Sequence, residues 1–208
     1  MHSFTWHRLR NAPIDRNWTS PIAPQRYLLK YFRAARPKPE APVEILTIQP
    51  FLQYFGNVRD RTMRVARFIP ADRIDWTYSP GKFTFGDLLR HVAVTERYMF
   101  AESVQGKPSR YTSHGKEFAE SRDDIFLLME RLHQESMDIF AALSDADLQK
   151  KCSTPGNAPI TTWKWLRSMA EHEIHHWGQI YIYLALIGVP SPPLYGLTSE
   201  EVRARIQA

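Results

Sequence analysis

Two histidines four residues apart, His172 and His176, form the most informative pattern in the chain. In a helix, this spacing places both imidazoles on one face, about one turn apart. Such a pair can bind one metal ion without bending the helix, but a third ligand must come from another segment. His91 is the candidate, because it lies on the apolar stripe of a predicted upstream helix. We therefore predict that His91, His172 and His176 bind one divalent metal ion.

Three neutral histidines leave one coordination position open, which is typical of catalytic rather than structural metal sites. Zinc is the default expectation because it accepts tetrahedral sites, although nickel, cobalt, iron and copper also bind imidazole. Four further residues are predicted to line the pocket or orient the ligands: Asp87, Glu173, His175 and Gln179. For Asp87, a role in capping its own helix explains the residue equally well. The charged neighbours of His91 are expected on the solvated face of the helix: Arg90, Glu96 and Arg97.

The same segment also contains the His-Glu-x-x-His signature of zinc metalloproteases, in which Glu173 would be the general base. The context disfavours this alternative. No strand pattern is evident that could bind an extended peptide. A carboxylate ligand would have to be Glu200 or Glu201, beyond two prolines, and His91 would have no role.

Helical periodicity of the apolar residues predicts four long amphipathic helices. Because Pro50 suits only a first turn, the first helix is expected to begin at or just before it. We expect a capping box at Thr84 and Asp87, an N-cap at Ser121, and a capping box at Thr198 that opens a short C-terminal helix. The predicted long helices span about 50–69, 84–105, 121–143 and 162–187, and the short C-terminal helix begins at about residue 199. The fold class predicted is all-α, an antiparallel four-helix bundle.

The N-terminal residues 1–43 differ in composition from the rest and are predicted to be an irregular extension of a bundle domain at 44–208. They hold six prolines and little apolar periodicity. Residues 1–40 also contain eight of the 27 Lys/Arg and two of the 22 Asp/Glu, so 19 basic and 20 acidic residues remain elsewhere. The bundle is therefore nearly neutral, and we expect no nucleic-acid partner.

Composition also bounds the environment of the protein. The single cysteine, Cys152, cannot form an internal disulfide and is predicted to be an unreactive loop thiol, which fits a cytoplasmic location. No run of about 18 apolar residues occurs, so no membrane span is predicted. The chain does not open with a signal-peptide pattern.

Three segments occur in an order and separation that together are specific: a helix from Ile48 to Arg67, Thr84–His91 followed by Thr95-Glu96-Arg97, and His172–Ile180. They resemble the DinB/YfiT-like superfamily of metalloenzymes over about residues 45–205, and the tail Leu194–Thr198 matches one branch. The resemblance implies an antiparallel bundle with a three-histidine metal site at His91, His172 and His176. Where the family usually has Arg-Gly-Gln after the last ligand, this chain has Trp177-Gly178-Gln179.

Characterised relatives in this superfamily include transferases and isomerases that use low-molecular-weight thiols. The resemblance thus implies a thiol-dependent S-transferase or detoxification enzyme with a small-molecule substrate. A metal-dependent hydrolase that uses metal-bound water and a non-catalytic metal- or ligand-binding stress protein remain alternatives. Because four-helix bundles of this size often pair through a helix face, we expect a homodimer.

The predicted ligand set can be tested by elemental analysis of the purified protein. We expect one divalent ion per chain, and loss of that ion in His91→Ala because two imidazoles on one helix hold a metal weakly. A full metal content in this variant would show that the third ligand is another residue.

Overall fold

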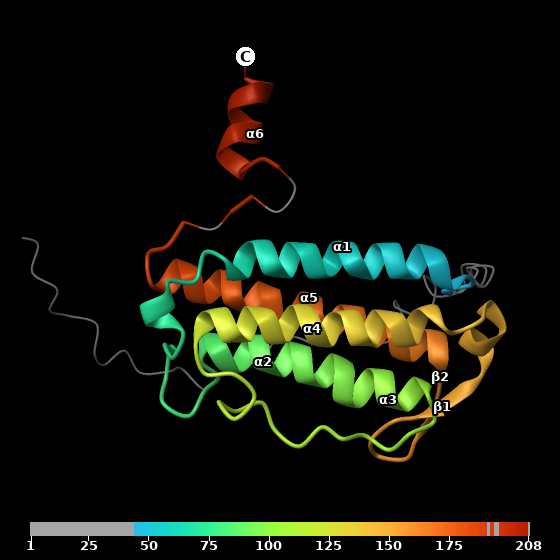
Figure 1. Cartoon of the computed structure of the whole chain (residues 1–208). Helices are drawn as coiled ribbons and strands as arrows, with labels where there is room; N and C mark the ends of the chain where they lie inside the picture. Colours follow the sequence, from blue (N-terminus) through green and yellow to red (C-terminus); the bar gives the residue numbers. More distant parts are fainter. Residues whose placement is uncertain (1–43, 191, 194–195, 208) are drawn as a thin grey trace, which may run out of the picture. The chain divides into compact units, whose positions relative to one another are not determined.

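The computed structural model describes residues 44–190, 192–193 and 196–207, and the predicted N-terminal extension lies outside them. Four long helical segments form a bundle (Figure 1), which confirms the predicted fold class. The segments are α1 (Ile48–Ala66), α2 (Phe85–Thr95) continued by η3 (Glu96–Phe100) and α3 (Ala101–Val104), α4 (Arg122–Ala141), and α5 (Thr162–Leu186). Shorter helices are η2 (Ala71–Arg73), η4 (Asp145–Gln149) and α6 (Ser199–Ile206).

The order of the helices around the bundle differs from a simple up-and-down arrangement. Figure 1 shows α1 and α5 running in one direction, and α2 and α4 in the other. Helix α1 packs against α4 and α5, and α2 packs against the same two helices. Each helix therefore has one antiparallel and one parallel neighbour. The parallel pair α2 and α4 requires a long return connection, which residues 105–121 supply.

The predicted helix starts are confirmed by their capping bonds. In the capping box of α2, the Thr84 amide donates to Asp87 Oδ2 over 2.9 Å, and the Asp87 amide donates to Thr84 Oγ1 over 3.0 Å. Ser121 and Thr198 cap α4 and α6 in the same way. Gly188, with φ of +73°, follows α5 in the left-handed conformation that glycine adopts without steric cost.

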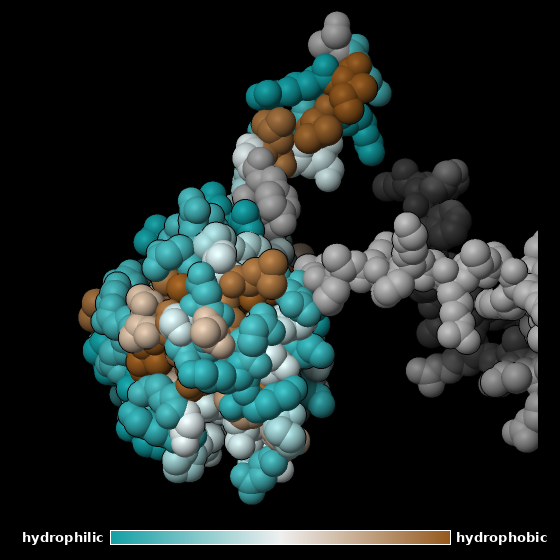
Figure 2. Space-filling view, turned by 90° about the vertical axis from the view of Figure 1, so that its right-hand side faces the viewer, coloured by the Kyte–Doolittle hydropathy of each residue, from teal (hydrophilic) through white to brown (hydrophobic). Residues whose placement is uncertain are grey.

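The core lies between the helices, and each helix contributes a fully buried side chain to it: Phe55, Leu89, Leu132 and Leu166. Burial of such a side chain stabilises the fold by about 1.5–3 kcal/mol. Figure 2 shows that hydrophilic residues cover most of the end of the bundle at which α1 begins, with smaller hydrophobic patches among them. No helix among the described residues is long and apolar enough to cross a membrane.

The second predicted helix contains a π-helical segment, η3, that its periodicity does not reveal. A π turn holds an extra residue, so it changes which side chains face the core beyond that point. Glu96 opens this segment and is only 3% exposed, which corrects the expectation that it lies on the solvated face. Such segments occur frequently at functional sites.

Two short strands were not predicted, because three residues are too few to show alternation. Strands β1 (Lys151–Ser153) and β2 (Pro159–Thr161) pair antiparallel, with Cys152 opposite Ile160. Asn157, with φ of 60°, lies in the turn between them. Cys152 is therefore a buried strand residue rather than a loop thiol, and burial raises its pKa. The raised pKa agrees with the prediction that this thiol is unreactive.

A cluster of charged side chains joins all four long helical segments inside the bundle. Arg59 of α1 donates to Glu96 Oε2 of η3, and also to Glu173 Oε2 of α5 over 3.0 Å. His133 Nδ1 of α4 lies 2.9 Å from Glu96 Oε1. Arg59, Glu96 and Glu173 are each less than 5% exposed, so water does not screen these contacts. One guanidinium thus holds two buried carboxylates from different helices.

We expect Arg59→Met to lower the free energy of unfolding by about 3–5 kcal/mol, because it leaves two buried carboxylates without their cation. Urea unfolding followed by circular dichroism measures the loss. The control is Arg64→Met in the exposed part of the same helix, which should change stability by about 0.5 kcal/mol or less. Equal stabilities of the two variants would contradict a stabilising role for the cluster.

Candidate metal centre

The bundle brings together the three histidines that the sequence singles out. His91 comes from α2, and His172 and His176 from one face of α5. The Nε2 atom of His172 lies 3.0 Å from Nε2 of His91 and 3.1 Å from Nε2 of His176. Among the described residues, these three form the one group of potential ligands whose binding atoms all lie within 4.8 Å of one another.

The spacing of the three nitrogens fits a divalent ion. A tetrahedral zinc ion with Zn–N bonds of 2.0–2.1 Å would place its nitrogen ligands about 3.3 Å apart. The two Nε2–Nε2 distances of 3.0 and 3.1 Å are slightly shorter, so a small outward movement of the rings would suffice. The three rings meet at steep angles, and no two of them stack face to face. The residues therefore fit the metal that the sequence predicts.

Burial keeps the three imidazoles in the protonation state that a metal requires. His176 is 8% exposed, and His91 and His172 are half-buried. Desolvation, followed by the proximity of other histidines, lowers the pKa of His91 to about 4 and that of His172 to about 3. Desolvation also lowers the pKa of His176. All three rings are thus neutral near pH 7 and offer lone pairs.

A hydrogen bond behind the ring fixes which nitrogen of His176 faces the centre, and His91 has hydroxyl partners in the corresponding position. Gln179 Oε1 accepts a hydrogen bond from His176 Nδ1 over 2.7 Å, which leaves the lone pair on Nε2. On His91, Nδ1 lies 3.0 Å from the Tyr111 hydroxyl and 3.3 Å from Thr95 Oγ1. If His91 donates from Nδ1, its Nε2 also points a lone pair toward the other histidines.

Tyr111 extends this contact to a fourth histidine. Its hydroxyl lies 3.0 Å from Nδ1 of His114, as well as 3.0 Å from Nδ1 of His91. With His91 as donor, the tyrosine oxygen accepts one hydrogen bond and its O–H donates the next to His114. The His114 ring also contacts the rings of His91 and Phe83. His91, Tyr111 and His114 therefore form a continuous hydrogen-bonded path away from the centre.

Arg90 holds the segment that carries Tyr111 and His114 against α2. Its guanidinium donates to the carbonyl oxygens of His114 and Ala119 over 2.9 and 3.0 Å. Arg90 is fully buried, which corrects the expectation that it lies on the solvated face. A Cβ atom on Gly86 would lie 3.0 Å from Arg90 Nη1, so the absence of a side chain at Gly86 leaves room for the guanidinium.

The other predicted site residues are placed differently from one another. Gln179 forms a hydrogen bond with His176. His175 is exposed, and the centroid of its ring lies 5.1 Å from that of the His176 ring. Asp87 makes the capping bonds of α2 and accepts a hydrogen bond from Arg90 Nη2 over 2.7 Å, but no hydrogen bond joins it to His91 in the described part of the chain. Glu173 faces Arg59 in the buried charge cluster rather than the three histidines. Its placement does not suit the general base of a metalloprotease.

Sequence reasoning missed Tyr111, His114, Thr95, Arg59 and His133. Tyr111 and His114 lie in a connection without periodicity, so no spacing rule relates them to His91. Thr95 does lie four residues after His91, a spacing that places the two side chains on one face of the helix. That spacing is the one signal in the sequence that could have identified it.

The sequence is similar to that of known proteins. A sequence model of the DinB superfamily matches residues 54–180. The uncharacterised protein YjoA of Bacillus subtilis strain 168 is 22% identical over 147 residues, which cover 69% of this chain and 93% of YjoA.

Solved structures share the fold. A DinB-like protein from Bacillus cereus ATCC 10987 superposes with a TM-score of 0.62 at 18% identity, covering 72% of this chain and 99% of that one. YfiT from Bacillus subtilis, described as a probable metal-dependent hydrolase with an unusual four-helix bundle topology, superposes with a TM-score of 0.59 at 16% identity. That match covers 74% of this chain and 94% of YfiT.

We expect Gln179→Leu to weaken zinc binding about 10–100-fold, because His176 loses the acceptor that fixes its tautomer. Titration against a chromophoric chelator measures the affinity. Gln179→Glu should retain most of it, since a carboxylate also accepts from Nδ1. Gln134→Leu on the exposed face of α4 is the matched control and should leave zinc affinity unchanged. An unchanged affinity in Gln179→Leu would rule out this orienting role.

Proposed function

The chain belongs to the DinB superfamily, and from this premise we propose that it is a metal-dependent S-transferase that activates a low-molecular-weight thiol for attack on a small electrophile. The observation that carries the proposal is the convergence of three neutral imidazole nitrogens within 4.8 Å of one another. A divalent ion held there, with zinc as our first choice, would supply a Lewis acid that lowers the pKa of a thiol or water molecule beside it.

The surroundings of the three histidines favour a thiol as nucleophile. Among the described residues, no carboxylate forms a hydrogen bond or ion pair with any of the three rings. The carboxylate that the protease motif would use, Glu173, is bound to Arg59. Attack by water usually requires a general base, whereas a thiol that has lost its proton is nucleophilic without one. A site without a carboxylate therefore suits thiol transfer better than proteolysis.

In this proposal, the chain's own groups orient the ligands and carry the proton. Gln179 and Tyr111 hold His176 and His91 with their Nε2 atoms toward the centre. The thiol proton passes to the Tyr111 oxygen as the tyrosine passes its own proton to Nδ1 of His114, whose half-buried ring can exchange with solvent. The sulfur atom then forms a bond to an electrophilic carbon, and the leaving group departs with the electrons of its broken bond.

A metal-dependent hydrolase is the second candidate, and one specific observation favours it. YfiT, which shares the fold, is described as a probable metal-dependent hydrolase. In a hydrolase on this scaffold, the ion would lower the pKa of a water molecule, and Tyr111 and His114 would be the groups beside His91 that could accept its proton.

One pair of assays separates the candidates. Zinc-loaded protein is incubated with monobromobimane and a panel of small thiols, and separately with p-nitrophenyl acetate without thiol. We expect a metal-dependent rate only in the first assay, and its loss in His176→Ala because two ligands remain. Ester cleavage without thiol, abolished by the same substitution, would instead establish the hydrolase. Tight metal binding without turnover in either assay would refute both and identify a binding protein.

A further inference from the structure

A second feature near the metal centre is a cavity of about 610 Å³ between the β-hairpin and the segment that follows α3. Its volume falls within the range of about 300–1,000 Å³ that is typical of small-molecule sites. Met99 and Ser103 of the helix line one side, and Cys152 of β1 lines another. The walls combine apolar surface with several hydroxyl and amide groups, as expected for a site that orients a polar ligand.

The charged side chains that line this cavity are all positive. Lys107 and Lys151 line it, and no aspartate or glutamate does. Lys107 Nζ donates to Gln105 Oε1 and Lys151 Nζ donates to Thr161 Oγ1, both neutral acceptors. Neither lysine forms an ion pair with any described carboxylate, and the nearby Glu102 is already bound by Arg97 and Arg110. Two uncompensated cations around one cavity favour an anionic occupant.

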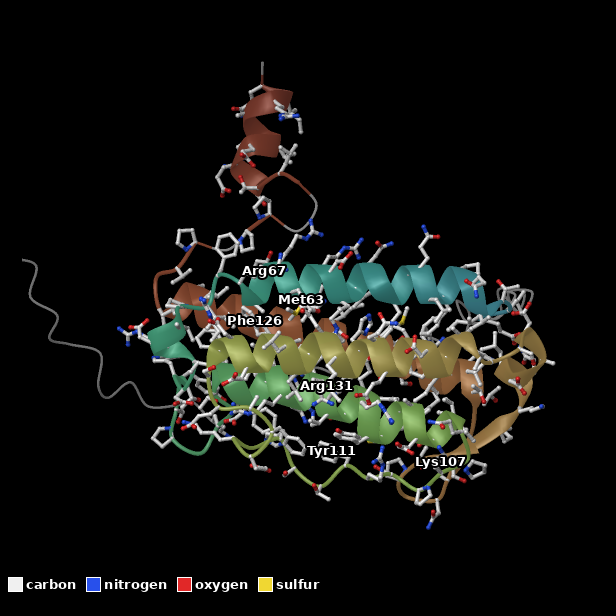
Figure 3. The ribbon with its side chains drawn as sticks, viewed as in Figure 1. Met63, Arg67, Lys107, Tyr111, Phe126 and Arg131 are labelled. Carbon is white, nitrogen blue, oxygen red and sulfur yellow. The ribbon has the colours of Figure 1, made fainter. Side chains whose placement is uncertain are left out.

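Tyr111 belongs both to this cavity and to the metal centre. It lines the cavity, and its hydroxyl contacts Nδ1 of His91 and of His114. Figure 3 shows Lys107 and Tyr111 on the same connection, which leaves the end of α3 and returns alongside α2. A molecule in the cavity would therefore contact the residue whose hydroxyl lies 3.0 Å from Nδ1 of His91.

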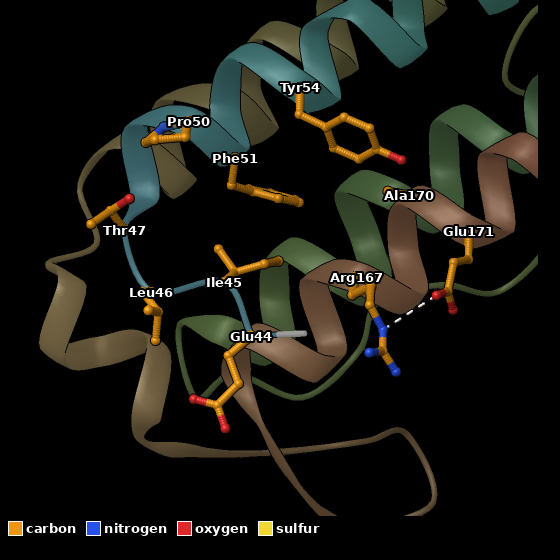
Figure 4. Close-up of a pocket in the computed structure, with 10 residues that line it drawn as sticks. All are labelled: Glu44, Ile45, Leu46, Thr47, Pro50, Phe51, Tyr54, Arg167, Ala170 and Glu171. Atoms are coloured by element: carbon orange, nitrogen blue, oxygen red, sulfur yellow. Dashed lines mark ion pairs between the residues drawn. The ribbon is translucent and has the colours of Figure 1, made fainter. Parts of the chain in front are cut away.

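A different cavity, of about 510 Å³, lies between the start of α1 and α5 (Figure 4). Its charged residues are Glu44, Arg167 and Glu171, and the arginine pairs with Glu171 over 3.2 Å. None of the histidines of the centre lines it, and its one cation is already paired with a carboxylate. The cavity beside Tyr111 is thus the better candidate for the site at which a small molecule binds next to the metal centre.

We propose that the cavity beside Tyr111 binds the carboxylate end of the thiol cosubstrate, with Lys107 and Lys151 as its cationic partners. This inference rests on the proposed function in one respect, the identification of the anion as the thiol cosubstrate. The inference restricts the thiol cosubstrate to low-molecular-weight thiols that bear a carboxylate. It also gives the hairpin a role, because β1 places Lys151 opposite the segment that carries Lys107 and Tyr111.

The test measures binding separately from turnover. Isothermal titration calorimetry on the zinc-loaded full chain uses S-methyl-N-acetylcysteine, which keeps the carboxylate but cannot form a thiolate or a disulfide with Cys152. Its neutral amide is the matched ligand. We expect the acid to bind at least about tenfold more tightly than the amide, with an affinity that falls as salt concentration rises.

Substitutions then locate the anion. Lys107→Met/Lys151→Met should weaken binding of the acid about tenfold and remove its preference over the amide. The control is Lys116→Met/Lys164→Met, which removes the same charge from two exposed lysines that do not line the cavity. It should bind the acid like the unaltered protein. Lys107 and Lys151 are also exposed, so their loss should leave folding intact.

The outcomes distinguish this inference from the proposed function. Equal binding of acid and amide, no binding of the acid at millimolar concentration, or equal affinities of the two double variants would overturn the inference. Metal-dependent thiol transfer could continue in each of those cases. Lysine-dependent binding of the acid without any turnover would instead support the anion site and refute the transferase.

Discussion

The buried guanidinium of Arg59 forms the contact on which the geometry of the centre depends. It binds Glu96 and Glu173, and these two carboxylates lie next to the site in sequence. Glu173 follows His172 directly, and Glu96 follows Thr95, which contacts His91. The guanidinium thus ties α2 to α5 beside the histidines that each helix supplies. Because a buried carboxylate is costly without a cation, the two helices cannot separate there without a large loss of stability.

The metal centre and the charge cluster use adjacent faces of α5. On one face, desolvation keeps His172 and His176 neutral and ready to bind a metal. On the other, burial raises the pKa of Glu173, and Arg59 opposes that rise. The His-Glu-x-x-His pattern therefore has a structural glutamate here. A shared sequence signature does not establish a shared mechanism, because the helix turns successive residues about 100° apart.

The long return connection gives the bundle its functional surface. Parallel packing of α2 and α4 requires residues 105–121 to run back along α2, where Arg90 fixes them by their carbonyl oxygens. Tyr111 is thereby brought to His91, and the same segment forms a wall of the cavity that also borders the β-hairpin. The topology places a loop with few apolar residues next to the metal centre, which is a common way for a rigid scaffold to carry function.

The sequence by itself determined the helices, their caps and the three converging histidines. These features depend on contacts between residues three or four apart, and on apolar stripes that must be buried. Only the tertiary structure decided the helix directions, the π segment, the hairpin, and the burial of Arg90, Glu96 and Arg59. It also brought Tyr111 and His114 to His91. Some of these features join residues that are far apart in the chain, and others depend on whether a charged side chain points into the core or into solvent. Local spacing in the sequence encodes neither kind of feature.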